Sequence, residues 1–403
     1  MQTAARCKAV LELMQLVFAD QKPADHIINA YFRERRFIGS ADRRFISETI
    51  WDVIRHRRRL EFDAGSADPR QMLIFYLKDA DPAEIFCGGA YGMPMLTEAE
   101  QKRLSAAEDK VYPPAVESEC PDWLFERINN PELLKSLNQP AGADLRVNRG
   151  SREEVMRQLQ TEGFEVVPTP YSPLGVRSLK RINLNNCLAY REGLVEVQDE
   201  ASQLAALLCD VGPNDRTIDY CCGAGGKSLA VAALLNGQGM IEAHDIDMRR
   251  LEQLKPRMQR LGIRNIKPVA KAENRPVYKR FIIDAPCSGT GTWRRSPDAK
   301  FRLNPSRLAE LNRIQAEILE TAYPLTASGG RIVYITCSVL AEENGWIAQS
   351  FMERHPDMMP AGLPQIWRDK TGLPYPGADE RWLELNPLST GTDGFFVCVM
   401  EKR

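Results

Sequence analysis

Hydrophobic residues recur at helical spacing through residues 4–60 of the chain. Apolar positions three or four residues apart lie on one face of an α-helix. Here they include Val10, Leu11, Leu13, Met14, Val17 and Phe18. The pattern weakens after residue 68, where Gly88-Gly89 and Pro113-Pro114 interrupt it. We therefore predict an α-helical domain over residues 1–130.

A shorter stretch with a mixed pattern follows, over residues 131–195. Residues 145–148 and 163–167 are predicted to form short strands. Between them Ser151 is a favourable N-cap for a helix, and Glu153-Glu154 suit the positive end of the helix dipole. The sequence predicts a small α+β module here.

From residue 196 onward, short apolar runs alternate with helical stretches. The predicted strands cover residues 217–220, 240–245, 281–284 and 331–335, and the predicted helices cover residues 201–208, 229–235, 249–261 and 308–325. Repeated strand and helix units favour a mostly parallel sheet that binds ligands at the carboxyl ends of its strands. We therefore predict an α/β domain over residues 196–403.

Composition narrows the class of protein. A chain of 403 residues is too long for one ordinary core, which agrees with several domains. The net charge of −1 gives no argument for nucleic-acid binding. Ten cysteines without a dense framework, and no signal peptide, predict reduced thiols in the cytoplasm. No apolar run approaches about 18 residues, the length of a membrane-spanning helix, so we expect no membrane partner.

Basic residues are nevertheless concentrated in the helical region. Its polar positions carry Arg33, Arg35, Arg36, Arg43, Arg44, Arg55, Arg57, Arg58 and Arg59. These side chains form either a solvated helix face or a surface that contacts RNA phosphates. The sequence leaves both interpretations open.

A glycine-rich turn at residues 219–228 separates a predicted strand from a predicted helix. Its glycines let the backbone approach a ligand closely. A Walker A phosphate loop would need glycine where this chain has Cys221, and the spacing of a dinucleotide-binding turn is also missing. Asp245 follows after about 20 residues at a strand end, where a carboxylate can accept hydrogen bonds from ribose. A tight turn with a solvated acid is the alternative.

Two cysteines each follow an apolar run and precede serine. They occur in Asp284-Ala285-Pro286-Cys287-Ser288-Gly289-Thr290-Gly291 and in Tyr334-Ile335-Thr336-Cys337-Ser338. Neither has the paired cysteine or histidine of a zinc site, so we expect no metal. Burial as small apolar side chains is a second alternative. A thiolate at a loop mouth can instead attack an electrophilic carbon if its pKa is lowered.

Pyrimidine bases provide such a carbon. Addition of a thiolate to C6 of cytosine makes C5 nucleophilic toward a methyl electrophile. A base must then remove the proton from C5, and the sulfur leaves. Asp284 is suited to hydrogen-bond the N3 and N4 edge of the base, with a protonated carboxyl group where it donates to N3.

These segments resemble the RNA 5-methylcytosine methyltransferases of the Fmu/Sun/Nop type. The resemblance spans residues 120–403 and rests on residues 198–202, 219–228, 245–247, 250–251, 284–291, 294–298, 336–338 and 393–396. Residues 41–46 and 51–55 are similar to the NusB-like RNA-binding domain of the bacterial members that act on 16S ribosomal RNA.

The resemblance implies S-adenosylmethionine as the methyl donor and RNA, in particular ribosomal RNA, as the partner. It implies a Rossmann-like class I methyltransferase domain with a mostly parallel seven-stranded sheet. Cys337 would be the nucleophile and Cys287 would act in release of the adduct. Asp245 would hold the donor's ribose, and Asp284 would lie between donor and base. The donor site would be lined by Cys222, Gly223, Ala224, Gly225, Gly226 and Lys227, and Lys227 could also position the substrate.

The chain departs from the family pattern at two motifs. Cys222-Gly223-Ala224 stands where the family usually carries Ala-Ala-Pro. Residues 266–273 offer no Asp for the adenine side of the donor, and Glu273 is the candidate substitute. Two other classes remain as alternatives. The retained cysteines argue against an RNA-binding or assembly factor with weakened catalysis, and the glycine spacing argues against a small-molecule oxidoreductase.

Overall fold

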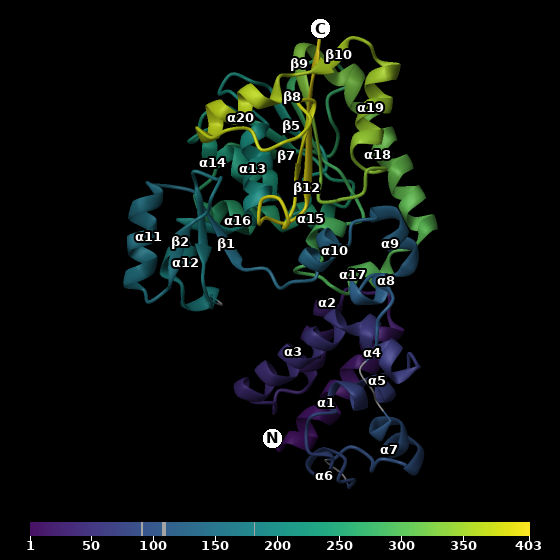
Figure 1. Ribbon diagram of the computed structural model, residues 1–403. Coiled ribbons are helices and arrows are strands. Elements are labelled where there is room, and N and C mark those ends of the chain that lie inside the picture. Colours follow the sequence, from purple (N-terminus) through teal and green to yellow (C-terminus); the bar gives the residue numbers. More distant parts are fainter. Residues whose placement is uncertain (90–91, 107–109, 181) are drawn as a thin grey trace. The chain divides into compact units, whose positions relative to one another are not determined.

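The computed structural model describes residues 1–89, 92–106, 110–180 and 182–403. These residues form two units (Figure 1). The first combines Met1–Gln139 with Trp293–Asn304, and the second combines Pro140–Thr292 with Pro305–Arg403. The sequence pattern does not predict that Trp293–Asn304 belongs to the first unit. The division into three domains with boundaries at residues 130 and 195 stays a prediction.

The described part of the first unit is built from helices. They are α1 (Thr3–Ala19), α2 (Ala24–Glu34), α3 (Ser40–Arg55), α4 (Arg57–Ala64), α5 (Pro69–Tyr76), α6 (Pro82–Ile85), α7 (Glu98–Ser105), α8 (Pro114–Glu117), α9 (Asp122–Ile128), α10 (Pro131–Leu137) and α17 (Ala299–Arg302). The helical prediction for residues 4–60 is confirmed. Val10, Leu13 and Met14 of α1 are fully buried, as their spacing predicts. Packing of such apolar faces supplies most of the stability of short helices.

The segment Trp293–Asn304 is anchored in the first unit by a buried lysine. Lys300 is only 2% exposed. Its Nζ donates to the main-chain oxygen of Glu119 at 2.9 Å and to Oδ1 of Asn138 at 2.8 Å. Burial lowers the pKa of Lys300 to about 8. The chain that leaves the Cys287 loop therefore continues directly into the core of the helical unit.

The second unit contains a four-stranded antiparallel sheet with the order β2-β3-β1-β4. Its elements are β1 (Ala143–Val147), α11 (Arg152–Thr161), β2 (Val166–Pro168), β3 (Gly175–Ser178), a 3-10 turn (Leu184–Asn186), α12 (Leu188–Arg191) and β4 (Val195–Val197). Ser151 and Glu154 form a reciprocal capping box at the start of α11. The predicted strands at 145–148 and 163–167 are present with shifted ends. The strands β3 and β4 were not predicted from the pattern.

A larger sheet has the strand order β10-β12-β9-β8-β5-β6-β7, with β11 paired to β12. Its strands are β5 (Thr217–Asp219), β6 (Ile241–Ala243), β7 (Ile266–Pro268), β8 (Tyr278–Asp284), β9 (Thr326–Thr336), β10 (Met358–Pro360), β11 (Trp382–Leu385) and β12 (Phe395–Lys402). Strands β5 to β9 are parallel, and the pairs that involve β12 are antiparallel. The predicted Rossmann-like, mostly parallel sheet is confirmed. It has an eighth strand because β11 and β10 pair with successive parts of β12.

Helices cover both faces of this sheet (Figure 1). They are α13 (Glu200–Leu208), α14 (Gly226–Leu234), α15 (Met248–Glu252), α16 (Leu254–Leu261), α18 (Pro305–Leu325), α19 (Gly345–Arg354) and α20 (Leu363–Thr371). Along β8, Ile282 packs in the core with α13 and α14, whereas Phe281 and Ile283 pack in the core with α18 and α19. This alternation is the two-residue period of a strand covered on both faces.

The helix predicted over residues 249–261 is two helices, α15 and α16. Gln253 separates them. Pro256 lies in the first turn of α16, where a missing N–H leaves no helical hydrogen bond unmade. The chain therefore accommodates Pro256 by ending α15 and beginning a second helix, α16.

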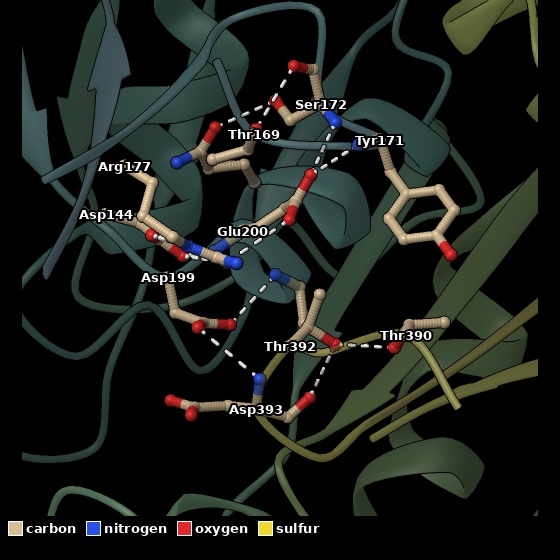
Figure 2. A network of polar contacts seen from close by, with 12 residues as sticks. Asp144, Thr169, Tyr171, Ser172, Arg177, Asp199, Glu200, Thr390, Thr392 and Asp393 are labelled. Carbon is tan, nitrogen blue, oxygen red and sulfur yellow. Dashed lines mark hydrogen bonds and ion pairs between the residues drawn. The ribbon is translucent and has the colours of Figure 1, made fainter. Parts of the chain in front are cut away.

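A buried polar network joins the small sheet to α13 (Figure 2). Arg177 of β3 donates to the two carboxylate oxygens of Asp144 of β1 at 2.7 and 2.9 Å, and to Oε2 of Glu200 at 3.4 Å. Glu200 is fully buried and also accepts from the main-chain N–H groups of Tyr171 and Ser172. Burial raises the pKa of Glu200. These hydrogen bonds and ion pairs link β1 and β3 to the first residue of α13.

Candidate active site

The carboxyl ends of β6, β5, β8 and β9 lie side by side at one edge of the large sheet. The chain runs from β5 through β6 to β7 on one side and returns as β8 on the other side of β5. Open α/β sheets bind ligands where the strand order reverses in this way. The predicted site residues lie at these four strand ends or in the segments that follow them, with Lys227 in the first turn of α14.

The glycine-rich turn after β5 is a tight entry into α14. The N–H of Gly225 donates to the carbonyl oxygen of Cys222 at 2.8 Å. Gly223 and Gly225 have φ angles of +54° and +84°, which favour glycine. A Cβ at Gly225 would also lie 2.3 Å from Cδ1 of Leu254. The turn therefore presents bare backbone, while the Cys222 side chain is buried.

Side-chain hydrogen bonds fix the remaining residues of the turn and the start of α14. Nη1 of Arg257 donates to the carbonyl oxygen of Ala224 at 2.5 Å, and Gly226 is the first residue of α14. Asp219 at the end of β5 is fully buried, and its Oδ2 accepts from the hydroxyl of Ser228 at 2.5 Å. Burial raises the pKa of Asp219 to about 7. The contact ties the first turn of α14 to the strand.

Asp245 lies two residues beyond β6 and is 4% exposed. Its Oδ2 accepts from the N–H of Gly223 at 2.8 Å, and its Oδ1 accepts from the N–H of Asp247 at 2.9 Å. Each carboxylate oxygen can accept two hydrogen bonds. Asp245 is thus fixed against the glycine turn and keeps capacity for the hydroxyl groups of a ribose. This arrangement fits a nucleoside such as that of S-adenosylmethionine.

Lys227 and Asp284 form an ion pair, with Nζ 3.2 Å from Oδ2. Lys227 is 4% exposed, donates to the hydroxyl of Ser202 at 2.9 Å and lies over the ring of Phe395 at 4.8 Å. The Asp284 side chain is 34% exposed. The carboxylate of this pair is therefore partly accessible to solvent. Ser202 and Phe395 were not predicted as site residues, although both lie in segments that carry the family resemblance.

Cys287 and Cys337 meet at the ends of β8 and β9. Their Sγ atoms lie 3.4 Å apart. Both residues are partly exposed, which argues against the interpretation that they are buried apolar side chains. The hydrogen bond to Cys337, followed by burial, raises the pKa of Cys287. Cys287 therefore favours the thiol form.

A buried glutamate that the sequence analysis missed connects the two cysteine loops. Glu343 is fully buried and contacts Ser288, which follows Cys287, and Ser338, which follows Cys337. The only local signal was an acidic residue six positions after Cys337. Its partners on the other loop are far away in the chain, so pattern alone did not point to it.

Glu273 does not replace the missing aspartate of the third motif. Its carboxylate forms ion pairs with Arg216 and Arg275. Arg216 immediately precedes β5 and therefore lies at the amino end of that strand. The donor would bind at the opposite edge of the sheet, so the suggested substitution by Glu273 is wrong.

No group of three or more histidine, cysteine or acidic side chains within the described ranges has the arrangement of a metal site. Among the helices that the structure describes, none combines the length and apolar character required to cross a bilayer.

Comparison with known proteins decides the family. The family described as 16S rRNA methyltransferase RsmB/F matches residues 206–401, and the RsmF/B-like ferredoxin-like domain matches residues 120–185. The chain is 31% identical to a probable ribosomal RNA small subunit methyltransferase B of Bacillus subtilis over 74% of this chain and 70% of that protein. The chain belongs to the RsmB/F family. A Synechocystis relative of the same type is 28% identical over 90% of this chain and 91% of its own length.

Solved structures agree with the fold of the RsmB/F family. The crystal structure of PH0851 has a TM-score of 0.79 at 24% identity and covers 100% of this chain and 99% of its own. NSun6 from Pyrococcus horikoshii has a TM-score of 0.62 at 20% identity and covers 70% of this chain and 98% of its own. The predicted S-adenosylmethionine-dependent RNA methyltransferase of the Fmu/Sun/Nop type is confirmed.

Seven of the nine arginines singled out in the sequence of the helical unit fall into two groups. Of the other two, Arg35 pairs with Glu12 and Glu34, and Arg43 donates to the carbonyl oxygen of Ile38. Arg57, Arg58 and Arg59 form ion pairs with Glu61, Asp122 and Glu119, respectively. Arg55 donates to the carbonyl oxygens of Asn138 and Arg294. These four side chains therefore hold the unit together. Arg33, Arg36 and Arg44 are exposed to solvent and could meet RNA phosphates.

Proposed function

We propose that this protein methylates C5 of a cytosine in small-subunit ribosomal RNA, with Cys337 as the nucleophile and Cys287 as the residue that completes release. The observation that carries this proposal is the 3.4 Å contact between the two sulfurs at the sheet edge that also holds the glycine turn and Asp245. The names of the curated relatives support ribosomal RNA as the substrate.

The reaction begins at the Cys337 thiolate. Its sulfur bonds to C6 of the cytosine, and the electron pair of the C5–C6 double bond moves toward C5 and the N3 side of the ring. Asp284, as the carboxylate that pairs with Lys227, accepts from the N4 amino group of the base, and the positive charge of Lys227 offsets the negative charge that develops on the ring. S-adenosylmethionine supplies the electrophilic methyl group that C5 takes.

Release requires loss of the proton on C5. Once Cys337 is a neutral thioether, the main cause of the high pKa of Cys287 is removed. Cys287 can then give its own proton to solvent and, as a thiolate, take the proton from C5. The electrons of that C–H bond restore the C5–C6 double bond and expel the Cys337 thiolate. One proton is released for each methyl group transferred.

The remaining site residues bind and orient the reactants. The donor site consists of Cys222, Gly223, Ala224, Gly225, Gly226 and Lys227, with Asp245 on the ribose and Asp284 between donor and base. The contact of Asp245 with the Gly223 N–H supports this assignment. The ion pair of Lys227 with Asp284 orients the carboxyl group, and Lys227 can also contact the substrate.

The other parts of the chain bind RNA. A NusB-like helical domain (1–130) and the small α+β module (131–195) extend the methyltransferase domain (196–403) in this proposal. The exposed arginines of the helical unit support a phosphate contact. A nucleophilic thiol must stay reduced, which supports a cytoplasmic site of action.

The decisive experiment measures transfer of tritium from methyl-labelled S-adenosylmethionine to 16S ribosomal RNA, both as naked RNA and in small subunits from cells that lack the protein. Bisulfite sequencing of RNA from cells with and without the protein then identifies the cytosine. We expect label and one protected cytosine only when the protein is present. RNA binding without label on any RNA would favour an assembly factor instead.

A further inference from the structure

We propose that Glu343 is a positioning residue whose buried carboxylate fastens the Cys287 loop to the Cys337 loop and thereby sets the distance between the two sulfurs. This role rests on the proposed function, because it matters for turnover only if both cysteines act on one base. Glu343 lies between β9 and α19 and touches neither the glycine turn nor Asp245 among the contacts of the described residues.

The carboxylate bridges the two loops directly. Oε1 of Glu343 accepts from the N–H of Ser288 at 2.8 Å, and Oε2 accepts from the hydroxyl of Ser338 at 2.5 Å. The Ser288 hydroxyl also donates to Oε2. Ser288 follows Cys287 and Ser338 follows Cys337 in the chain. Each oxygen of the carboxylate is therefore bonded to the residue next to a reacting sulfur.

Other groups keep Glu343 in place. Nε2 of Gln315, on α18, donates to Oε1 at 3.0 Å and also to the carbonyl oxygen of Pro286 at 3.0 Å. The Tyr334 hydroxyl of β9 donates to the main-chain oxygen of Glu343 at 2.6 Å. Gln315 and Glu343 are both fully buried. The carboxylate thus has little freedom to follow either loop if that loop moves.

Direct contacts between the loops depend on the same alignment. The hydroxyls of Thr290 and Ser338 lie 3.0 Å apart, and the N–H of Gly291 donates to the Cys337 carbonyl oxygen at 3.0 Å. Within the segment that follows Cys337, the side-chain amide of Asn344 donates to the Ser338 carbonyl oxygen at 2.9 Å. Glu343 is the one acidic group in this set of described contacts. A buried carboxylate is costly without its donors, so the set is formed as a whole.

The charge of Glu343 also acts on the cysteine pair. The groups that face Cys287 include Cys337, Glu343 and the Tyr334 hydroxyl. After the contact with Cys337 and burial, the negative charge of Glu343 contributes to raising the pKa of Cys287. Glu343 therefore aligns the loops and also helps to keep Cys287 in the thiol form before the release step.

The test compares Glu343→Gln with Glu317→Gln in the full chain. Glu317 lies on the same helix as Gln315, but it is 61% exposed and pairs only with Arg313 among the described contacts. We expect Glu343→Gln to lower kcat about a hundredfold, the cost of a misplacement on the order of 1 Å. The KM for S-adenosylmethionine should stay within about twofold. Glu317→Gln should change neither constant.

Cysteine alkylation provides a readout that a purely structural role would not move. Iodoacetamide labelling of Cys287, resolved from Cys337 by mass spectrometry, is measured against pH without RNA or donor. Loss of the Glu343 charge should shift the Cys287 profile to lower pH in Glu343→Gln. The profile in Glu317→Gln should coincide with that of the parent protein.

If Glu343→Gln does not fold, Ser338→Ala removes one hydroxyl contact and leaves the carboxylate in place. We then expect about a tenfold loss of kcat at unchanged donor KM. Unchanged kcat in the folded variant, or a lower kcat with an unmoved Cys287 profile in Glu343→Gln, would overturn the positioning role. If the parent protein methylates no RNA, the proposed function fails instead. The two failures can be told apart because the alkylation profiles are measured without turnover.

Discussion

The sulfur atoms of Cys287 and Cys337 touch at 3.4 Å although 50 residues separate them in the chain. The contact exists because β8 and β9 are parallel neighbours whose ends are in register, with Asp284 opposite Ile335. Each strand delivers its cysteine to the same edge of the sheet. Two thiols at this distance can both reach the ring of one base. This supports different roles for the two cysteines in a single reaction.

Cysteine substitutions should separate those tasks. We expect Cys337→Ala to abolish methyl transfer, because no sulfur then adds to C6. We expect Cys287→Ala to form the adduct without releasing it, and to appear as a protein–RNA band that resists denaturing electrophoresis. Cys87→Ala, which alters an exposed cysteine of the helical unit, is the control and should behave as the parent protein. A stable adduct in Cys337→Ala would reverse the assignment.

Donor binding should depend on the carboxylate at the end of β6. Asp245→Asn keeps the size of the side chain but removes its charge, and the new amide N–H cannot accept from the Gly223 N–H. We expect the Kd for S-adenosylmethionine, measured by calorimetry, to rise at least about tenfold, equivalent to about 1.4 kcal/mol. The matched control is Asp247→Asn, which affects the N-cap of α15. Equal weakening by both variants would count against a specific ribose contact.

Substitution by alanine should destabilise the protein at Gly225 but not at the neighbouring Gly226. Gly225→Ala places a Cβ at φ +84° and 2.3 Å from the buried Leu254 side chain. We expect a loss of about 1–3 kcal/mol in the free energy of unfolding, measured with urea. Gly226→Ala meets no atom within 4 Å and begins a helix, so it should be neutral or stabilise by about 0.5 kcal/mol. Similar losses for both would contradict the turn geometry.

RNA affinity should respond to the exposed arginines of the helical unit. Replacement of Arg33, Arg36 and Arg44 by Gln should weaken binding of ribosomal RNA and reduce its dependence on salt. Each lost phosphate contact should lower the slope of log K against log salt by about 0.7–0.9. Arg313→Gln, on the exposed face of α18, is the control. An unchanged slope in the triple variant would assign these arginines to a solvated helix face.

The pattern of the sequence was most informative where structure depends on nearby residues. The buried face of α1 and the alternating faces of β8 follow from residues that are close in the chain. The pattern was least informative after residue 335, where it predicted neither the helices α19 and α20 nor the strands β10, β11 and β12. The edge strands β10 and β11 are only three and four residues long, and their pairing with β12 sets their conformation.

The order of the motifs was sufficient to predict the family, the donor and the class of fold. Each motif is a local run of residues whose chemistry can be recognised without knowledge of its neighbours in space. The sequence likewise identified Cys287 and Cys337 as a pair, because both follow a strand and precede a serine.

Contacts between distant segments required the folded chain. The ion pair of Lys227 with Asp284 and the bridge of Glu343 between two loops depend on which strands become neighbours. That choice follows from burying both faces of the large sheet at once under helices that are widely spaced in the sequence. The pairing of distant strands cannot be read from a local run of residues. The sequence therefore offered no reason to distinguish Glu343 from other acidic residues, whereas the folded chain places it between the two cysteine loops.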